Sequence, residues 1–148
     1  MIEFLAGSTV LLLALMGAIQ LSLVWAGQGA VETAAHFAAR KFAIHARIDL
    51  RKAKEAALAE AATICLHRPG GRWGKAQLTS IDFSRQESGK PVRAPGAGDA
   101  YRLLITHGVE LSVPWANRIL YAIAPVKKTR IRDQYFLLLQ ASRLVTVE

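Results

Sequence analysis

The chain has 148 residues, of which 52% are hydrophobic, and it carries a formal net charge of +8 with one cysteine, Cys65. This size suits one small domain with one membrane segment and excludes two full domains. A single cysteine excludes an internal disulfide, although it permits a bridge between two chains.

The first predicted element is an uncharged apolar run from Phe4 to Trp25. As a helix the run measures about 33 Å, enough to cross a hydrocarbon core of about 30 Å. We therefore predict a transmembrane helix over residues 1–26, with Trp25 at the headgroups. A signal peptide cleaved near Ala26 or Gly27 is the alternative, but its apolar core is normally about 7–15 residues long and follows a basic start.

Charge is divided between the two parts of the chain, because all 19 Lys and Arg lie beyond residue 26. The basic remainder is compatible with anionic lipid, nucleic acid or an acidic partner, and equally with a simply soluble surface. By the positive-inside rule, the bases after the span would keep the C-terminal part in the cytoplasm. These bases are Arg40, Lys41, Arg47, Arg51 and Lys52.

The next predicted element, over residues 27–67, is an amphipathic continuation of the helix. Glycine costs a helix about 1 kcal/mol relative to alanine, so Gly27 and Gly29 predict a bend or melted turn between the two halves. HRPGG at 67–71 predicts the helix end, and an unbroken helix over 4–66 would be about 95 Å long. We expect a narrow alanine-rich stripe of this helix to pack on a sheet. The stripe is Val31, Ala34, Ala35, Ala38, Phe42, Ala46, Ala53, Ala57, Ala61 and Ile64.

Residues 68–148 are predicted to form a small antiparallel β-sheet domain of three to four strands. Strand-like alternation is present at 76–84, at 100–113 as one strand or two broken at Gly108, and most strongly at 135–148. Residues 89–100 are predicted to be a loop and 114–134 a mixed connection. The predicted fold class is therefore α+β: a long N-terminal helix, with a transmembrane half and an amphipathic half, packed on the sheet.

Three stretches together resemble one family. They are MIEF followed at once by the apolar span, GQGAVETAAHFAARKFA, and the ending THGVELSVPWANRIL with LLLQASRLVTVE. In these stretches the chain resembles the TadE-like minor pilins, or pseudopilins, of tight-adherence (type IVb-like) pili. The resemblance implies a pilin-like fold and a function in assembly, in which the subunit primes, caps or joins a pilus filament.

The resemblance also implies partners and a location. In that family a prepilin peptidase cuts after a basic leader that ends in glycine, and for this chain the resemblance implies a location only if such a leader lies upstream of Met1. Its bases would stay cytoplasmic, which would place the chain as a single-pass protein of the bacterial inner membrane with a periplasmic C-terminal domain, available for a pilus. The expected partners are major and minor pilins, the inner-membrane assembly platform, the prepilin peptidase and membrane lipid.

Glu3 occupies the place of the glutamate near the start of the family's apolar segment. A carboxylate at mid-membrane costs about 2.5–3.5 kcal/mol on insertion scales, and less near the edge. The α-amino group of a neighbouring subunit would neutralise it and set the axial register between helices. The plainer interpretation is a flanking residue in the headgroups.

Small residues give the span positions at which helices approach closely. Ala14 and Ala18 form a small-xxx-small pair, and Gly7 lies seven residues before Ala14. The predicted subunit interface is Glu3, Phe4, Gly7, Ala14, Gly17 and Ala18.

The motifs for catalysis or metal binding are weak, and we predict no enzyme, metal or cofactor. GGRWGKA at 70–76 is one residue short of a phosphate loop and follows a helix. The four histidines His36, His45, His67 and His107 are dispersed, as surface or capping residues would be. Cys65 is expected to pack as a small apolar side chain beneath the sheet.

The basic run VKKTRIRDQ at 126–134 supplies Lys127, Lys128, Arg130 and Arg132. In an extended segment, three of these bases share a face that suits DNA or anionic lipid phosphates. A solvated hairpin loop is the favoured interpretation, and nucleic acid is not an expected partner. The rival functions are thus a pilin-like DNA-binding subunit and a membrane-anchored periplasmic domain that binds a soluble partner.

Overall fold

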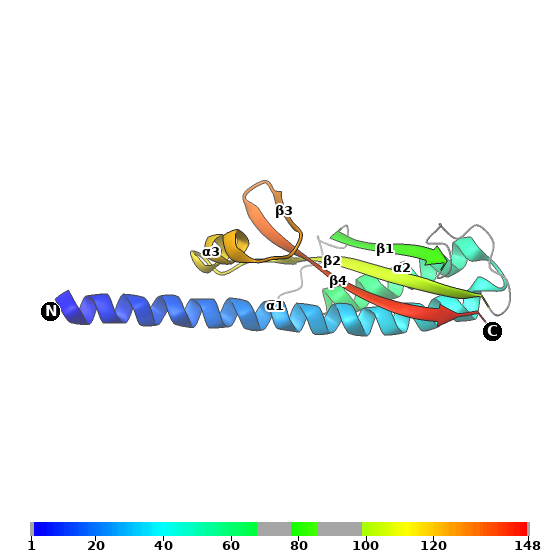
Figure 1. The fold of residues 1–148 in the computed structure, drawn as a ribbon, viewed down its shortest axis with the longest axis horizontal. Helices are drawn as coiled ribbons and strands as arrows, with labels where there is room; N and C mark the ends of the chain where they lie inside the picture. Colours follow the sequence, from blue (N-terminus) through cyan, green and yellow to red (C-terminus); the bar gives the residue numbers. More distant parts are fainter. Residues whose placement is uncertain (1, 68–77, 86–98, 148) are drawn as a thin grey trace.

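The computed structural model describes residues 2–67, 78–85 and 99–147. The GGRWGKA motif, most of the predicted loop 89–100 and the helix stop beyond His67 lie outside the described residues. Figure 1 shows a long helix that carries a folded head on its C-terminal half, while its N-terminal half projects from the head.

Helix α1 spans Ile2–Ala46 and runs without a break through Gly27 and Gly29. The predicted bend at these glycines is therefore wrong. A Cβ built on Gly27 would lie 2.7 Å from Val109 Cγ2 and 3.4 Å from Leu139 Cδ1, whereas one on Gly29 would meet none of the described atoms within 4 Å. Gly27 thus lets the helix approach the sheet closely, and packing against the sheet outweighs the weak helix propensity of glycine.

Alanine substitutions at the two glycines are expected to change stability in opposite directions. Gly27→Ala should lower the free energy of unfolding by about 1 kcal/mol, because overpacking of about 1–3 kcal/mol exceeds the gain in helix propensity. Gly29→Ala should raise it by up to about 1 kcal/mol. Urea unfolding of the full chain in detergent measures both values, and an equal gain at both positions would contradict the packing role of Gly27.

The helical region breaks at residues 47–49, where Ile48 and Asp49 N–H groups both donate to the His45 carbonyl at 3.1 Å. Asp49 caps the next helix: its carboxylate accepts from Arg51 N at 2.9 Å and Lys52 N at 3.2 Å. The Lys52 amide, with the other backbone bond and nearby cations, lowers the pKa of Asp49. Because the folded pKa is depressed, this contribution to stability is present above pH 3.8 and is lost as pH falls through the folded value.

Helix α2, Leu50–Leu66, lies alongside the C-terminal half of α1 and forms a helical hairpin with it. Residues 27–67 are therefore mostly helical as predicted, but they do not continue the first helix without a break. His67 ends α2, with its backbone N–H and ring Nδ1 within 3.1 and 2.7 Å of the Thr63 carbonyl, which confirms a capping histidine.

The predicted apolar stripe is buried, apart from Ile64, which is partly buried, and Cys65 is buried as predicted. Its partner differs in part from the prediction. The alanines of α1 face both α2 and the sheet, and those of α2 face chiefly α1, since among the described residues α2 contacts the sheet mainly at β1. Alanine suits both contacts because its small side chain lets backbones approach closely.

The sheet has four antiparallel strands in the order β1-β2-β4-β3, which confirms the predicted α+β fold and the strand number. The strands are β1 Thr79–Arg85, β2 Ala100–Glu110, β3 Lys128–Ile131 and β4 Gln134–Thr146, and helix α3, Ala116–Ile123, follows β2.

Helix α1 packs across β4 and β2, the two central strands. On β2 every second side chain is buried against the helices, at Tyr101, Leu103, Ile105, His107 and Val109. The strand continues through Gly108, so of the two predicted possibilities the single strand is correct. Gly108 lies against Leu78, whose Cβ would be 3.1 Å from an added Cβ.

Candidate assembly and membrane interface

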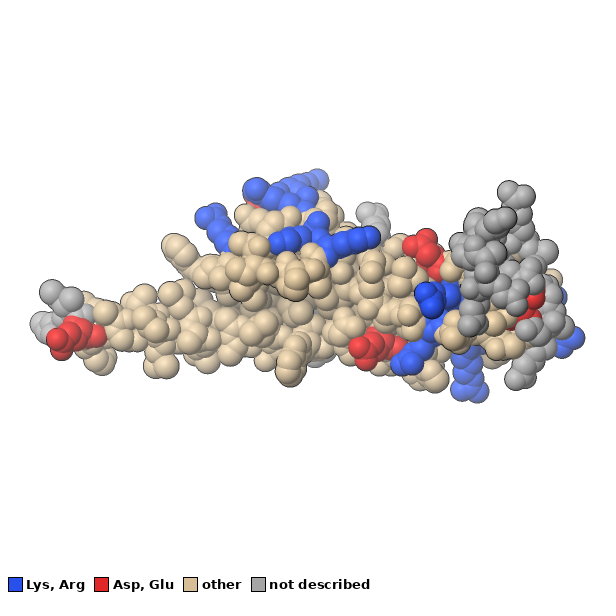
Figure 2. Space-filling view, in the orientation of Figure 1, with Lys and Arg blue, Asp and Glu red and all other residues tan. Residues whose placement is uncertain are grey.

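The N-terminal half of α1 carries many exposed large apolar side chains. Only 11% of its most apolar 18-residue stretch is buried by the rest of the molecule. The helix is long and apolar enough to span a membrane. Figure 2 shows this stretch free of charge except for the acidic group at its tip, where Glu3 lies in the first turn. Such a surface must be covered by lipid or by other chains.

Most of the predicted interface residues share one face of this helix. At about 100° per residue, Gly7, Ala14 and Ala18 fall within about 40° of one another, and Glu3 lies about 40° from Gly7. Trp25, which is 80% exposed, lies on the same face. Phe4 and Gly17 fall about 60° and 80° to either side of Gly7 and flank that face. All six predicted residues are at least partly exposed.

This face points away from the head. Gln20 and Gly27, which the head covers, lie about 140–160° around the helix from Gly7. A Cβ added at Gly7 or at Gly17 would meet no atom of the described residues within 4 Å. The small residues are therefore not used for packing within the chain, and the surface that they form is open to a neighbouring helix.

The head reaches further down the apolar run than the sequence predicted. Gln20 is 0% exposed, and its Oε1 accepts a hydrogen bond of 2.8 Å from the Val113 N–H. Its Nε2 is buried and has no hydrogen-bond partner within the part of the chain that the structure describes. The link between β2 and α3 is thus attached to α1 inside the predicted span. The only sequence signal was the isolated amide in an apolar run.

The basic run forms β3 and its hairpin turn rather than a loop. Lys128 Nζ lies 5.4 Å from the Tyr121 ring centroid and donates to the Ala122 carbonyl at 3.1 Å. Arg130 stacks over Tyr135 at 5.3 Å and pairs with Asp133 at 3.0 Å. Lys128 and Arg130 share a face as predicted, but Lys128 is held by α3, and Arg130 is held by partners within the hairpin.

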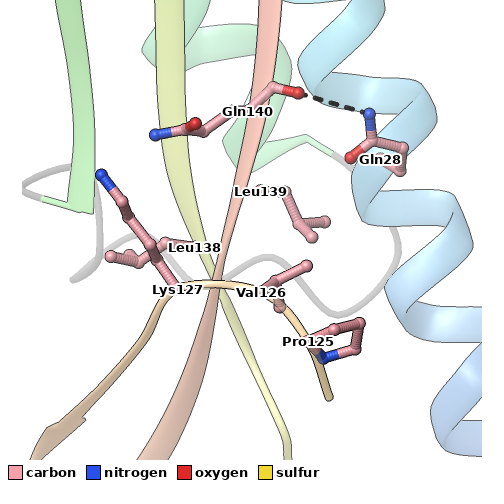
Figure 3. Close-up of a pocket in the computed structure, with 7 residues that line it drawn as sticks. All are labelled: Gln28, Pro125, Val126, Lys127, Leu138, Leu139 and Gln140. Atoms are coloured by element: carbon pink, nitrogen blue, oxygen red, sulfur yellow. Dashed lines mark hydrogen bonds between the residues drawn. The ribbon is translucent and has the colours of Figure 1, made fainter.

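A hollow of about 350 Å³ lies between α1 and β4. Figure 3 shows the residues that line it. Gln28 donates to the Gln140 carbonyl at 3.5 Å at its edge. Among the seven described residues that line it, none is a histidine, cysteine, carboxylate or hydroxyl. This lining offers no nucleophile or proton carrier other than Lys127. The lining residues are Gln28, Pro125, Val126, Lys127, Leu138, Leu139 and Gln140.

The histidines stay dispersed, and across residues 2–67, 78–85 and 99–147 no three His, Cys, Asp or Glu side chains gather as a metal site would require. His107 departs from the prediction of a surface or capping residue. It is only 2% exposed, and its Nδ1 lies 2.8 Å from Thr79 Oγ1. The bond joins β1 to β2 across the register pair formed by Thr79 and His107.

Comparison of the chain with protein-family models, curated proteins and solved structures finds no match.

Proposed function

We propose that the chain is a minor pilin or pseudopilin of a Tad-like, type IV-related pilus, which acts by assembly and not by catalysis. One observation carries the proposal: α1 is a single helix whose C-terminal half packs on an antiparallel sheet while its apolar N-terminal half stands free. A subunit of this shape joins others through the free half, with its head on the outside of the bundle.

The continuity of α1 also bears on the signal-peptide alternative. Gln20, Val24 and Gly27 pack against the head on the same helix. Cleavage near Ala26 would remove the Gln20 contact and break the packed face, so the structure favours an apolar segment that is retained in the mature protein.

Glu3 is the proposed register residue. It shares the open face with Gly7, Ala14 and Ala18, so a neighbouring α1 that packs against these small positions brings its own N-terminus within reach of the carboxylate. In a bundle that excludes water, a charge left alone is costly, and only staggers that pair it are stable.

The proposal is tested in the bacterium that encodes the chain. Deletion of the gene should remove most surface filaments, and a tagged copy should restore them and sediment with sheared filaments. Filaments in normal number without the chain would contradict the proposal and leave a membrane-anchored partner-binding domain. For the DNA-binding alternative, the test is salt-dependent binding of duplex DNA by the full chain.

A further inference from the structure

Helix α3 has one broad apolar face, of which only one half is used by the fold. Ala116 is buried, and Leu120 and Ala124 pack against the core. A second stripe at every fourth residue faces outward: Trp115, Ile119 and Ile123 are 71%, 55% and 69% exposed. One short helix thus exposes three large apolar side chains in a row.

The position of α3 along α1 indicates what covers this stripe. The hydrogen bond from Val113 N–H to Gln20 Oε1 attaches the start of α3 inside the apolar run. Gln20 lies about 7.5 Å along the helix before Trp25, where the run ends. Figure 1 shows α3 at the end of the head from which the bare part of α1 projects. A membrane crossed by this run therefore meets α3.

The charges near α3 suit the surface of such a membrane. From Trp115 to Asp133 the chain carries Asp133 as its one acid and five bases, Arg118, Lys127, Lys128, Arg130 and Arg132. Figure 2 shows Lys and Arg gathered over the β3 hairpin, on the head and not on the bare N-terminal part of α1. An apolar stripe with bases set further from the hydrocarbon is the arrangement of an interfacial helix on anionic lipid.

Trp115 adds a backbone observation. It is the N-cap of α3 and has φ 64° and ψ −53°, a conformation that is strained for a bulky residue. Its ring is nevertheless outside the core. Tryptophan is enriched at the interface between hydrocarbon and water. Contact with a membrane would therefore stabilise a Trp115 side chain that lies outside the core of the fold.

We propose that α3 lies in the headgroup region of the membrane that α1 crosses, with Trp115, Ile119 and Ile123 at the acyl boundary and the neighbouring bases on anionic lipid phosphates. The inference rests on the proposed membrane span of α1. It gives the head a second attachment, which fixes its depth and tilt, and α3 must leave the lipid when the subunit is drawn into a filament.

The test uses the full chain in vesicles, with and without phosphatidylglycerol in phosphatidylcholine that carries brominated acyl chains. Cys65→Ala removes the buried thiol, and an environment-sensitive fluorophore is placed on Val10→Cys, Ile119→Cys or Arg102→Cys. We expect bromine to quench the fluorescence of the probes at residues 10 and 119 but not that of the probe at residue 102. Quenching of the probe at residue 119 should decrease when phosphatidylglycerol is omitted. Ile123→Cys repeats the reading if Ile119→Cys folds poorly.

The outcomes separate this inference from its premise. Quenching at 10 with a water-exposed probe at 119 and 123 overturns the membrane contact of α3 alone. The probe at residue 119 could instead be shielded from water only at a high protein-to-lipid ratio and show no bromine quenching. That result also overturns the membrane contact and shows that another copy covers the stripe. An unquenched probe at 10 overturns the membrane span itself, and the proposed function with it.

Discussion

Glu3→Ala is expected to abolish incorporation of the chain into filaments while leaving its head folded. The carboxylate lies in the first turn of α1, far from the core, so its removal costs no packing in the head. In an assembled bundle, the substitution would leave the α-amino group of the neighbouring subunit unpaired in a site that excludes water. Breaking such a pair costs about 3 kcal/mol or more, which corresponds to a fall in incorporation on the order of 100-fold.

The incorporation of Glu3→Ala is measured as the fraction of the tagged chain in sheared filaments relative to membranes. Glu3→Gln, which keeps the shape and removes the charge, should fail equally. Glu55→Ala is the control. Glu55 is exposed on α2, and its ion pair with Arg51, at 4.0 Å, lies on the surface and contributes little stability. Normal incorporation of Glu3→Ala would sink the register role.

Phe42→Ala is expected to have the largest effect on the stability of the head, about 3–5 kcal/mol. Phe42 is 0% exposed, stacks on Phe83 with ring centroids 4.6 Å apart and meets the edge of Tyr101 at 6.1 Å. It therefore joins α1 to both β1 and β2, and alanine would leave a cavity among three elements.

The matched control for Phe42 is Phe37→Ala on the same helix. Phe37 is 43% exposed and touches His36 edge-on, so its loss should cost well under 1 kcal/mol. Urea unfolding of the full chain in detergent, followed by circular dichroism, measures both variants. Similar losses at the two positions would show that α1 is not held on the sheet through Phe42.

Much of this fold follows from local pattern. The apolar run and the alanine-rich stripe predict a helix with a buried face, and alternation predicts β1, β2 and β4 to within a few residues. These signals are strong because burial on one side imposes a period on the sequence. The short β3 was missed because its pattern is dominated by bases. Helix α3 was missed because it has only 8 residues and its N-cap, Trp115, makes no side-chain capping bond.

The breaks in the helix were predicted at the wrong place for a physical reason. Gly27 and Gly29 lower helix propensity, but a contact with Val109 that no local rule reveals holds the helix together there. The true break at 47–49 contains no glycine or proline. Asp49 is compatible with a helix interior and with an N-cap, and the packing of α2 back on α1 selects the cap.

The candidate interface was predictable in part. Glu3 and the small residues stand out in the span, and their common face follows from helix geometry alone. Which face the head occupies does not, because it depends on Gln20 and Gly27 meeting elements more than eighty residues away in the chain. The exposed stripe of α3 required the structure.

The central claim is that the open face of α1 meets another α1. In a Cys65→Ala background, Ala14→Cys lies on that face, whereas Leu13→Cys lies on the side of Gln20. Oxidative cross-linking in membranes and sheared filaments should join Ala14→Cys to a cysteine at the matching position of a second copy or another pilin, and leave Leu13→Cys unlinked. Equal cross-linking of both positions, or of neither in assembled filaments, would contradict the claim.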